Sequence, residues 1–565
     1  MTRISLILSG LLIICSPYLG AQWSTDPAVN TPICRAPNDQ HVNMIITDGR
    51  GGAMILWYDR RRNSNGEDIF AQWIDSAGVL RWASEGVLVA TADSGGYDNF
   101  QAVSYASGGF IIAWEYESSS IEAVFAQRIN VAGVRQWGAN GVPICTTTSI
   151  SPQLIEDGSG GAIMVWEDLR LGTNDGQIYA QRINSSGVPQ WSPNGVPVCT
   201  AAFNQTRPKI VRDGSTGAII AWGDRRGNTD SDIYAQRINS VGATQWTSNG
   251  IPICTASSDQ GAGWVLPDET GGAIVVWSDS RNVTPPEFYA QRVNPVGAVQ
   301  WSANGVRLGA IQGSLYNSSV RKDGSGGALL AWNYETSQGN VYAQRINSTG
   351  NIQWGTNGVA VCTASGRRFF SSIVSDGAGG AIIAWSDFRN GGEANKDIYA
   401  QRINASGLPQ WILNGVAISS AVGSQYFLDI TIGADGGAII AWEDTRNGET
   451  NSDIYAQRVN SNGTLGGPTS VGGSYNMPVH FTLHQNYPNP FNPSTVIDYE
   501  LPNAHNATLR VFDLLGREVA ILVNERLPAG VYSAEWNATG FASGVYYYQM
   551  RAGDFVKTKK LILLR

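Results

Sequence analysis

The sequence predicts an all-β protein, in which an eight-bladed β-propeller closed by an N-terminal strand is followed by a small β-sandwich. Three observations predict this fold. A segment like residues 157–199 recurs eight times at intervals of 52 to 57 residues, a period typical of propellers and other repeat arrays. Each copy contains four short apolar segments separated by Gly-rich turns. The last copy lacks one segment, which the start of the mature chain supplies. The copies are marked by Trp57, Trp114, Trp166, Trp222, Trp277, Trp332, Trp385 and Trp442.

Residues 1–21 are predicted to form a secretory signal peptide. Arg3 precedes an apolar run at residues 4–15, and two small residues stand directly before Gln22. The apolar run is too short to span a bilayer. The mature chain is therefore expected to begin at Gln22.

A lipoprotein signal is the alternative interpretation of the same segment, with Cys15 as the lipidated residue. It is disfavoured because Ile14 stands where lipoprotein signals carry a small residue. No second apolar segment of the chain reaches the length needed to span a membrane. We expect no transmembrane segment in the mature protein.

The charge pattern argues against nucleic acid or an anionic membrane as a partner. The formal net charge is −8 and the pI is about 5.2. Basic residues are spread through the repeats instead of gathering in one stretch, as a nucleic-acid-binding surface would require.

Each repeat within residues 22–463 is expected to form four short strands. In the fourth copy these are residues 208–212, 218–222, 232–239 and 249–254. An Asp-Gly pair between the first two strands favours a tight hairpin, because glycine accepts the positive φ that such turns need. Four strands in about 55 residues favour a propeller over a β-helix, whose coils are shorter.

The two ends of the array predict how the ring closes. The eighth copy stops after residues 453–463 and lacks the QW and NGVPVC segments of the other copies. The mature chain begins with these segments, as Gln22-Trp23 and residues 30–34. We therefore expect the N-terminal strand to pair beside residues 453–460 and complete the last blade, since an open solenoid would need polar caps instead.

The cysteines are expected to be buried free thiols. Five of them occupy one repeat position, at Cys34, Cys145, Cys199, Cys254 and Cys362. Equivalent outer strands of adjacent blades should lie too far apart for disulfides. The other three blades are interpreted as placing an ordinary hydrophobe in this position, namely Val89, Leu308 and Ile418.

Two charged motifs recur in most copies, and both allow a structural and a functional interpretation. A WxDxR motif follows the second strand, and an Arg ends the AQR sequence of the third strand. Either could contact a ligand, but a site needs one asymmetric arrangement, so we expect both to hold strands together. The AQR arginines are expected to stack on a blade tryptophan. The WxDxR pairs are Asp59/Arg61, Asp168/Arg170, Asp224/Arg226, Asp279/Arg281, Asp387/Arg389 and Asp444/Arg446.

No catalytic, cofactor-binding or metal-ligating residue is predicted. His41 is the only histidine of the repeat array, which gives neither a metal cluster nor a catalytic triad. The Asn/Asp-rich loops at residues 63–68, 227–232 and 447–453 could hold Ca²⁺ through oxygen ligands. Their spacing does not match a helix-loop-helix calcium site, so solvated turns are the preferred interpretation.

Departures from the repeat indicate where a ligand-binding face is to be sought. The second and sixth copies replace WxDxR with tyrosine-containing loops, at Tyr116 and Tyr334. The fifth copy has an additional Trp264 in its first strand. These three residues are the candidates for a ligand face, and drift between copies is the alternative explanation.

The repeat ends at Gly463, and residues 464–480 read as a flexible linker rich in Gly and Ser. Residues 481–565 then show several alternating apolar runs, which predict the small antiparallel sandwich. Within them, residues 486–493 read NYPNPFNP, 515–519 read LGREV and 544–548 read GVYYY.

These motifs resemble the C-terminal sorting domain (type A) of proteins exported by the bacterial type IX secretion system. The resemblance covers only residues 481–565 and implies an immunoglobulin-like fold, the type IX secretion machinery as a partner, and a protein that is secreted and then released or attached to the outer-membrane surface. An ordinary immunoglobulin-like binding module is the alternative. The matching positions are Asn486, Pro488, Pro490, Phe491, Gly516, Arg517, Gly544, Tyr546 and Lys559.

Three functions remain open for the propeller. The preferred one is a binding or interaction module whose loops contact a glycan, a protein or cell-envelope material. The alternative is a hydrolase or lyase of extracellular polysaccharide with its site at the mouth of the central channel, which would require a pair of suitably spaced carboxylates. A purely structural envelope protein is the third.

Overall fold

The structure is a computed structural model that describes residues 23–467 and 481–564, apart from 63–65, 92–95, 106–107, 119–120, 173–174, 228–229, 282–285, 311–317, 334–338, 393–394, 449, 487–488, 502–504, 528–529 and 554. The chain divides into two compact units, Met1–Thr469 and Ser470–Arg565. Both are built from β-strands, so the predicted all-β class is confirmed. None of the described helical segments has the length and apolarity needed to cross a membrane.

The first unit contains eight four-stranded antiparallel sheets and one short 3₁₀ turn, η3 (Ala434–Gly436). Seven sheets each use four consecutive strands, from β2-β3-β4-β5 to β26-β27-β28-β29, and the eighth has the order β30-β31-β32-β1. The strands of the first four sheets are β2 (Gln40–Thr47), β3 (Ala53–Asp59), β4 (Asp68–Ile74), β5 (Val87–Ala90), β6 (Gly96–Ser104), β7 (Gly109–Ser118), β8 (Ile121–Asn130), β9 (Val142–Cys145), β10 (Ser149–Glu156), β11 (Ala162–Asp168), β12 (Gln177–Ile183), β13 (Val196–Cys199), β14 (Gln205–Arg212), β15 (Ala218–Asp224), β16 (Asp232–Ile238) and β17 (Ile251–Cys254). Those of the other four are β18 (Gln260–Pro267), β19 (Ala273–Asp279), β20 (Glu287–Val293), β21 (Val306–Ala310), β22 (Ser318–Lys322), β23 (Ala328–Asn333), β24 (Val341–Ile346), β25 (Val359–Cys362), β26 (Arg368–Ser375), β27 (Ala381–Asp387), β28 (Asp397–Ile403), β29 (Val416–Ser419), β30 (Gln425–Ile432), β31 (Ala438–Asp444), β32 (Asp453–Val459) and β1 (Thr31–Cys34).

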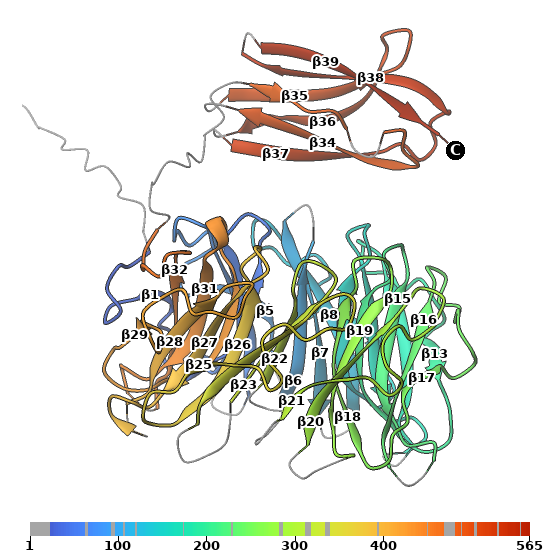
Figure 1. The fold of residues 1–565 in the computed structure, drawn as a ribbon. Coiled ribbons are helices and arrows are strands. Elements are labelled where there is room, and N and C mark those ends of the chain that lie inside the picture. Colours follow the sequence, from blue (N-terminus) through green and yellow to red (C-terminus); the bar gives the residue numbers. More distant parts are fainter. Residues whose placement is uncertain are drawn as a thin grey trace, which may run out of the picture. The chain divides into compact units, whose positions relative to one another are not determined.

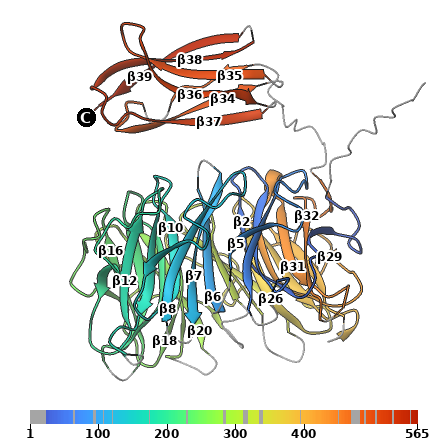
Figure 2. The same ribbon diagram turned by 180° about the vertical axis from the view of Figure 1, so that it is seen from behind.

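The first strands of neighbouring sheets contact one another in one continuous series. β2 contacts β6, β6 contacts β10, and the series continues through β14, β18, β22, β26 and β30. β30 in turn contacts β2, so the series of eight sheets returns to its start. Figures 1 and 2 show these sheets side by side from opposite directions.

Strand β1 completes the eighth sheet by pairing antiparallel with β32, which places Pro32 opposite Tyr455. The pairing predicted from the unequal ends of the array is therefore present. The indole Nε1 of Trp23, just before β1, donates a hydrogen bond to the backbone oxygen of Ser76 in the first sheet (3.0 Å). The N-terminal segment thus joins the last strands of the array in the eighth sheet and is also hydrogen-bonded to the first sheet.

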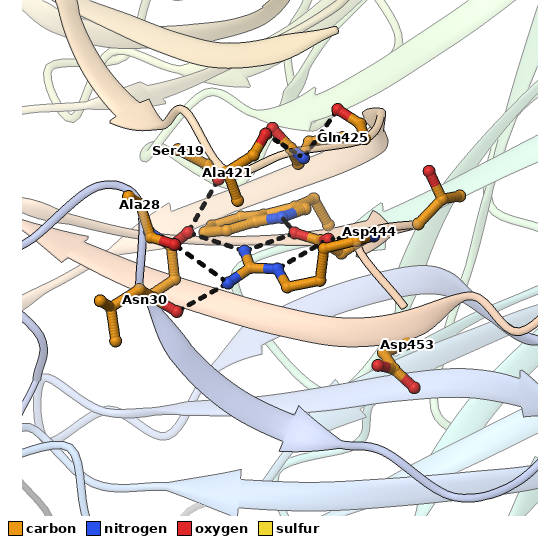
Figure 3. Close-up of polar contacts among 12 residues, drawn as sticks. Ala28, Asn30, Ser419, Ala421, Gln425, Asp444 and Asp453 are labelled. Atoms are coloured by element: carbon orange, nitrogen blue, oxygen red, sulfur yellow. Dashed lines mark hydrogen bonds and ion pairs between the residues drawn. The ribbon is translucent and has the colours of Figure 1, made fainter. Parts of the chain in front are cut away.

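A second contact at this seam is made by Arg446, in the loop after β31. Its Nη1 donates to the backbone oxygen of Val29 (2.8 Å) and its Nη2 to Oδ1 of Asn30 (2.9 Å). Asn30 Nδ2 in turn donates to the backbone oxygen of Ile418 in the seventh sheet (2.8 Å). Figure 3 shows Asn30 and Ala28 facing this cluster opposite Asp444, so the segment before β1 is anchored to two sheets.

The core of the first unit is divided among the interfaces between sheets. Second strands such as β15 are buried along their whole length, because neighbouring sheets cover both faces. The marker tryptophans lie fully buried in these interfaces. Gly195, before β13, has a φ of 85° and lies under the ring of Trp166, where a Cβ would come within 2.6 Å of the indole. This close approach explains why seven of the eight copies have Gly before their fourth strand, while the eighth has Asn30 there with a φ of 54°.

The Asp-Gly turn is longer than the tight hairpin that the sequence predicts. In the third copy, β10 ends at Glu156 and β11 begins at Ala162. The side chain of Asp157 accepts hydrogen bonds from the backbone nitrogens of Ser159 (2.8 Å) and Gly161 (2.9 Å). The carboxylate thus replaces a strand hydrogen bond and holds a wider loop.

The second unit has a three-stranded sheet, β33-β34-β37, and a four-stranded sheet, β36-β35-β38-β39. Apolar side chains from both sheets, including Ile497, Leu509 and Met550, form one buried cluster. The strands are β33 (Thr482–Leu483), β34 (Ser494–Leu501), β35 (His505–Phe512), β36 (Glu518–Leu527), β37 (Gly530–Asn537), β38 (Gly544–Ala552) and β39 (Phe555–Leu563).

Candidate functional site

The WxDxR motif joins three strands of one sheet, as the fourth copy illustrates. The buried carboxylate of Asp224 accepts hydrogen bonds from the indole of Trp222 (2.8 Å) and from Nε and Nη2 of Arg226 (2.8 and 2.6 Å). The guanidinium also lies 3.7 Å from the ring centre of Tyr234 and donates to the backbone oxygen of Asn249 (2.7 Å). A carboxylate with three such donors is held inside the fold, which supports the structural interpretation of the motif.

The same guanidinium–aromatic contact recurs wherever the motif is present. The stacked pairs are Arg61/Phe70, Arg170/Tyr179, Arg226/Tyr234, Arg281/Tyr289, Arg389/Tyr399 and Arg446/Tyr455. Because the contact recurs in six sheets and each pair stabilises its own sheet, it is a structural feature of the repeat.

Five of these six pairs have a cysteine beside them that comes from the preceding sheet, and the Arg446 pair has Ser419 at that position instead. Nη2 of Arg226 lies 3.6 Å from Sγ of Cys199, and burial raises the pKa of this thiol to about 12. All five cysteines of the described residues are buried and free, as predicted. At this pKa the thiol stays protonated and unreactive at neutral pH.

The residues that replace cysteine in the other three sheets differ from the prediction. Cys199 pairs with Ile178, and the equivalent partners in the other sheets are Ala90, Gly309 and Ser419. Val89, Leu308 and Ile418 are therefore the wrong residues for this position. The fourth strand shifts register at a bulge in all four of these sheets, so the bulge does not displace the equivalent residues. The position accepts small side chains, because the next sheet packs closely against it.

The AQR arginines form clamps between sheets and do not stack on tryptophan as predicted. Nε of Arg237 donates to the turn carboxylate of Asp213 (2.9 Å), and its Nη1 donates to the backbone oxygen of Pro295 in the next sheet (3.0 Å). The indole of Trp246 donates to the same oxygen (3.1 Å). In the second sheet, which lacks the turn aspartate, Arg128 lies over the ring of Tyr105 at 4.4 Å. Because the turn carboxylate is charged, the arginine pairs with it in preference to a ring.

The predicted ligand-face residues do not meet in one site. Tyr116 is half-buried in β7 and packs on Phe125, with ring centres 5.7 Å apart. Trp264 is half-buried in β18 and packs on Phe288 at 6.1 Å, between the fifth and sixth sheets. Tyr334 lies outside the described residues. Tyr116 and Trp264 belong to two separate core clusters, so they do not define a common surface.

The three loops considered for Ca²⁺ each include residues outside the described ranges. In the described parts, Asp68 pairs with Arg62 (2.6 Å) and Asp453 accepts a hydrogen bond from Asn447 (2.5 Å). Over the described ranges as a whole, no three His, Cys, Asp or Glu side chains are grouped to hold a metal ion.

The seventh and eighth sheets carry an aromatic patch, here defined as Phe369, Phe370, Phe388, Tyr426 and Phe427. Its rings form one continuous series. Ring centres lie 5.4 Å apart for Phe388 and Phe369, 6.2 Å for Phe369 and Phe370, 4.7 Å for Phe370 and Phe427, and 5.0 Å for Phe427 and Tyr426. Phe427 is 47% exposed, and Phe369, Phe370 and Tyr426 are partly exposed. An exposed cluster of rings on a secreted protein marks an interaction surface.

The backbone of the first strands presents these rings. β26 and β30 each contain a bulge, in which Phe370 and Phe427 have φ values of 52° and 49°. The bulge is a repeat feature, but its aromatic side chains are not. The equivalent residues in other copies with positive φ are Asn99, Ser151 and Arg207. Within the described residues of the array the patch therefore occurs once, as a binding site requires.

Two cations border the aromatic patch. Nζ of Lys396 lies 5.4 Å from the ring centre of Phe388 and 5.2 Å from that of Tyr426. The guanidinium of Arg367 lies over Phe369 at 4.6 Å. The backbone oxygen of Lys396 accepts a hydrogen bond from the nitrogen of Gln425 (2.7 Å), which fixes the loop of the seventh sheet to the start of β30.

Two carboxylates lie near each other where the second and third sheets meet. Glu115 accepts a hydrogen bond from the backbone nitrogen of Ser151 (3.1 Å), and Glu167 accepts one from that of Arg207 (3.2 Å). Burial raises the pKa of Glu167, the Arg207 backbone opposes this shift, and the charge of Glu115 adds to it. Both carboxyl-bearing residues are buried, with 8% of Glu115 and 7% of Glu167 exposed.

Sequence reasoning missed the aromatic patch. The signal that could have found it is the pair Phe369-Phe370 in one copy and Tyr426-Phe427 at the same place in the next. The patch begins inside the first strand, whereas the ligand face was predicted at the level of the loops.

The sorting-motif residues of the second unit serve its fold. Nδ2 of Asn486 donates to Oγ1 of Thr495 (2.9 Å), and Tyr548 donates its hydroxyl to the backbone oxygen of His484 (2.7 Å). Phe491 is buried and its nitrogen donates to the backbone oxygen of Ile562 (2.9 Å). This hydrogen bond joins the NPFNP segment (residues 489–493) to β39, the last strand.

The remaining motif residues lie in turns and on β38 and β39. Gly516 has a φ of 76° in the turn where Arg517 pairs with Asp513 (2.7 Å). The hydroxyl of Tyr546 donates to the backbone oxygen of Ala542 (2.9 Å). Gly544 begins β38, Lys559 lies opposite Tyr548 in β39, and Pro490 follows a cis bond. Pro488 is outside the described residues.

Comparison with solved structures finds only distant similarity. PorZ, a surface component of the type IX secretion system of Porphyromonas gingivalis, is 12% identical, with 94% of this chain and 70% of that chain covered and a TM-score of 0.31. The BP39L lectin of Burkholderia pseudomallei is 9% identical, with 68% and 100% covered and a TM-score of 0.42. A PL25 ulvan lyase is 9% identical, with 66% and 96% covered and a TM-score of 0.38. Similarity at this level says nothing about function.

The sequence comparisons identify the second unit. No curated protein matches the chain. Residues 485–564 match the family model of the secretion system C-terminal sorting domain. The second unit is therefore a sorting domain of the type IX secretion system, and it marks this chain as a secreted protein.

Proposed function

We propose that the protein is a cargo of the type IX secretion system whose first unit is an eight-bladed β-propeller. The closed series of first-strand contacts and the pairing of β1 with β32 support this interpretation. In this proposal residues 1–21 are the signal peptide, 22–463 the propeller, 464–480 a linker and 481–565 an immunoglobulin-like sorting domain. The secretion machinery is the partner of the sorting domain, and the mature protein is released or held at the outer-membrane surface.

The propeller serves as a binding module, and the aromatic patch is the observation that carries this proposal. The repeated charged residues are engaged in holding strands and sheets together, as Asp224 and Arg237 illustrate. Phe370 and Phe427 stand at a bulge where other described copies have Asn99, Ser151 or Arg207, and Phe427 is 47% exposed. Large aromatic side chains supply much of the binding energy at interaction surfaces. The ligand is a glycan or protein that contacts this patch.

Binding of the full secreted chain to a glycan array and to cell-envelope fractions tests the proposal. Phe427→Ala should abolish the retained ligand or weaken it at least tenfold. Phe203→Ala is the matched control, since Phe203 is similarly exposed (43%) but lies outside the patch. Equal binding of both variants, or no saturable ligand for the wild type, would refute a binding role for the patch.

A polysaccharide hydrolase or lyase is the second candidate, favoured by the raised pKa of Glu167 beside Glu115. The full chain would then release reducing or unsaturated ends from a polysaccharide, and Glu167→Gln would abolish this release. Absence of any product from a panel of uronic-acid and neutral polysaccharides, with saturable binding intact, would eliminate the enzymatic alternative.

A further inference from the structure

The aromatic patch holds a cation whose charge remains available to a ligand. The ammonium of Lys396 lies between the rings of Phe388 and Tyr426, within cation–π range of both. Within the ranges that the structure describes, no carboxylate oxygen pairs with this ammonium inside 4 Å. Ring contacts position the charge but do not neutralise it.

We propose that the patch binds an acidic saccharide, with a sugar ring stacked on Phe427 and its carboxylate or sulfate paired with Lys396. This inference rests on the proposed binding function and names its ligand class. An apolar ring face beside a fixed cation matches a ligand that combines a C–H face with an anionic group. Uronic acids and sulfated sugars have this combination.

The rings provide a rigid surface for the sugar. Phe427 packs against Phe370 at an interplanar angle of 49° and against Tyr426 at 72°. Its exposed part is therefore supported from two sides, and little side-chain entropy is lost when a ligand binds. The pyranose face is comparable in size to a phenyl ring, so one sugar residue covers Phe427.

An extended peptide is a poorer match for the same surface. Peptides commonly dock by adding a strand to an open sheet edge, where main-chain hydrogen bonds supply affinity. The patch strands β26 and β30 are the first strands of their sheets, and they lie against each other and against β22 and β2. This leaves a peptide no long open edge, whereas a saccharide needs only ring contacts and the cation.

Titration calorimetry of the full chain with three ligands tests the inference. The ligands are an oligogalacturonate hexamer, its carboxyl-reduced neutral form and a sulfated galactan hexamer, each at 50 and 200 mM salt. The variants are Phe427→Ala and Lys396→Gln. The matched controls are Phe203→Ala and Lys322→Gln, since Lys322 is an exposed lysine whose partner is Glu269.

At least one acidic oligosaccharide should bind, and its affinity should fall at higher salt. Lys396→Gln should weaken it about tenfold and reduce the salt dependence, while Phe427→Ala should weaken it at least tenfold. The two control variants should bind like the wild type. The oligogalacturonate and sulfated ligands together distinguish a carboxylate from a sulfate as the preferred anion.

Three outcomes would overturn the inference. In the first, the neutral form binds as tightly as the acidic forms and Lys396→Gln has no effect, so the binding function stands but the ligand class is wrong. In the second, a glutamate-rich peptide displaces the saccharide and depends more strongly on Phe427. In the third, no saccharide binds although the glycan array or envelope fraction identifies a Phe427-dependent ligand of another class.

Discussion

A single carboxylate organises each WxDxR loop, and the consequences of losing it can be estimated. Asp224 has a fully buried side chain, and its partner Arg226 is three-quarters buried. Removing one member of such a pair leaves the other charge without its partner inside the fold.

Asp224→Ala should lower the free energy of unfolding by about 3–5 kcal/mol, the range for breaking a buried pair from one side. Urea unfolding of the full chain measures the change. Arg212→Ala is the control, since its side chain is 44% exposed in the pair with Glu156. It should cost no more than about 1 kcal/mol. A cost for Asp224→Ala that is no larger than the control's would contradict the structural role of the motif.

At the cysteine position, a smaller side chain should lower the free energy of unfolding less than a larger one. Cys199→Ser should cost less than about 1.5 kcal/mol, since the seventh sheet has Ser419 at the equivalent position. Cys199→Val should cost about 1–3 kcal/mol, because it adds volume within 3.6 Å of Arg226. The same unfolding measurement ranks the two variants. If Cys199→Val leaves the free energy of unfolding unchanged, this interface is loosely packed.

His41 makes the seam between the first and eighth sheets sensitive to pH. Its Nδ1 lies 2.9 Å from Oε2 of Glu443, and this hydrogen bond raises the pKa of His41 above 6.5. Glu67 adds to the shift, and Arg60 opposes it. A raised folded-state pKa contributes stability below about pH 6.5, and this contribution is lost as the pH rises through the folded value.

The Tm difference between wild type and His41→Gln should therefore be largest near pH 5.5 and shrink toward pH 8.5. Glu443→Gln should remove the same pH dependence, because it removes the partner. Differential scanning calorimetry across this range provides the measurement. A Tm difference that grows with pH would reverse the assigned sign.

At the scale of elements, β1 is the strand on which closure depends. Without it, β32 exposes an unpaired edge, and Arg446 loses its acceptors at Val29 and Asn30. The buried Trp23 would also leave its place beside Ser76.

Deletion of residues 22–34 from the mature chain should lower the unfolding free energy of the first unit by more than about 4 kcal/mol, beyond the usual range of single substitutions. Thermal unfolding checks the result. The control deletes residues 470–473 of the linker, which should leave the Tm of the first unit unchanged. An unaltered Tm in the strand deletion would refute closure by β1.

The sequence predicted the elements that depend on the repeat. Trp23 matches the second tryptophan of the other seven copies, and Cys34 matches the cysteine of four of them, so the pairing of this segment with β32 could be deduced without coordinates. The cysteine position was misaligned by one residue, although counting four residues on from the glycine before each of these fourth strands gives Ala90, Gly309 and Ser419. The bulge beside Cys199 recurs in these three sheets, so it does not displace the equivalent residues.

The aromatic patch could not be predicted in the same way. Its rings come from two sheets, and Phe427 is exposed only because its bulge turns the side chain out of the alternation. Trp264 stands directly after the bulge of β18, and its side chain packs in an interface between sheets instead. Whether an aromatic residue of a first strand is core or surface is therefore decided by local backbone geometry.

At the scale of the whole molecule, the sorting domain determines where the protein goes. Ending the chain at Gly473 should leave a folded first unit in the periplasm and abolish its appearance outside the cell. Immunoblots of periplasmic and extracellular fractions measure the distribution. A chain with Arg510→Ala keeps the domain and should still be exported, since Arg510 is not one of the motif residues and forms a partly exposed pair with Glu518 (2.7 Å). Normal secretion of the truncated chain would contradict the assignment.

The pairing of β1 with β32 also sets an order of events during synthesis. β1 is synthesised first, but its partner β32 is synthesised only after all the other repeats. The eighth sheet therefore cannot be completed before the whole array has been made. The export signal lies farther along the chain than both partners. By the time the sorting domain has been synthesised, every strand needed to complete the series of eight sheets has therefore been synthesised as well.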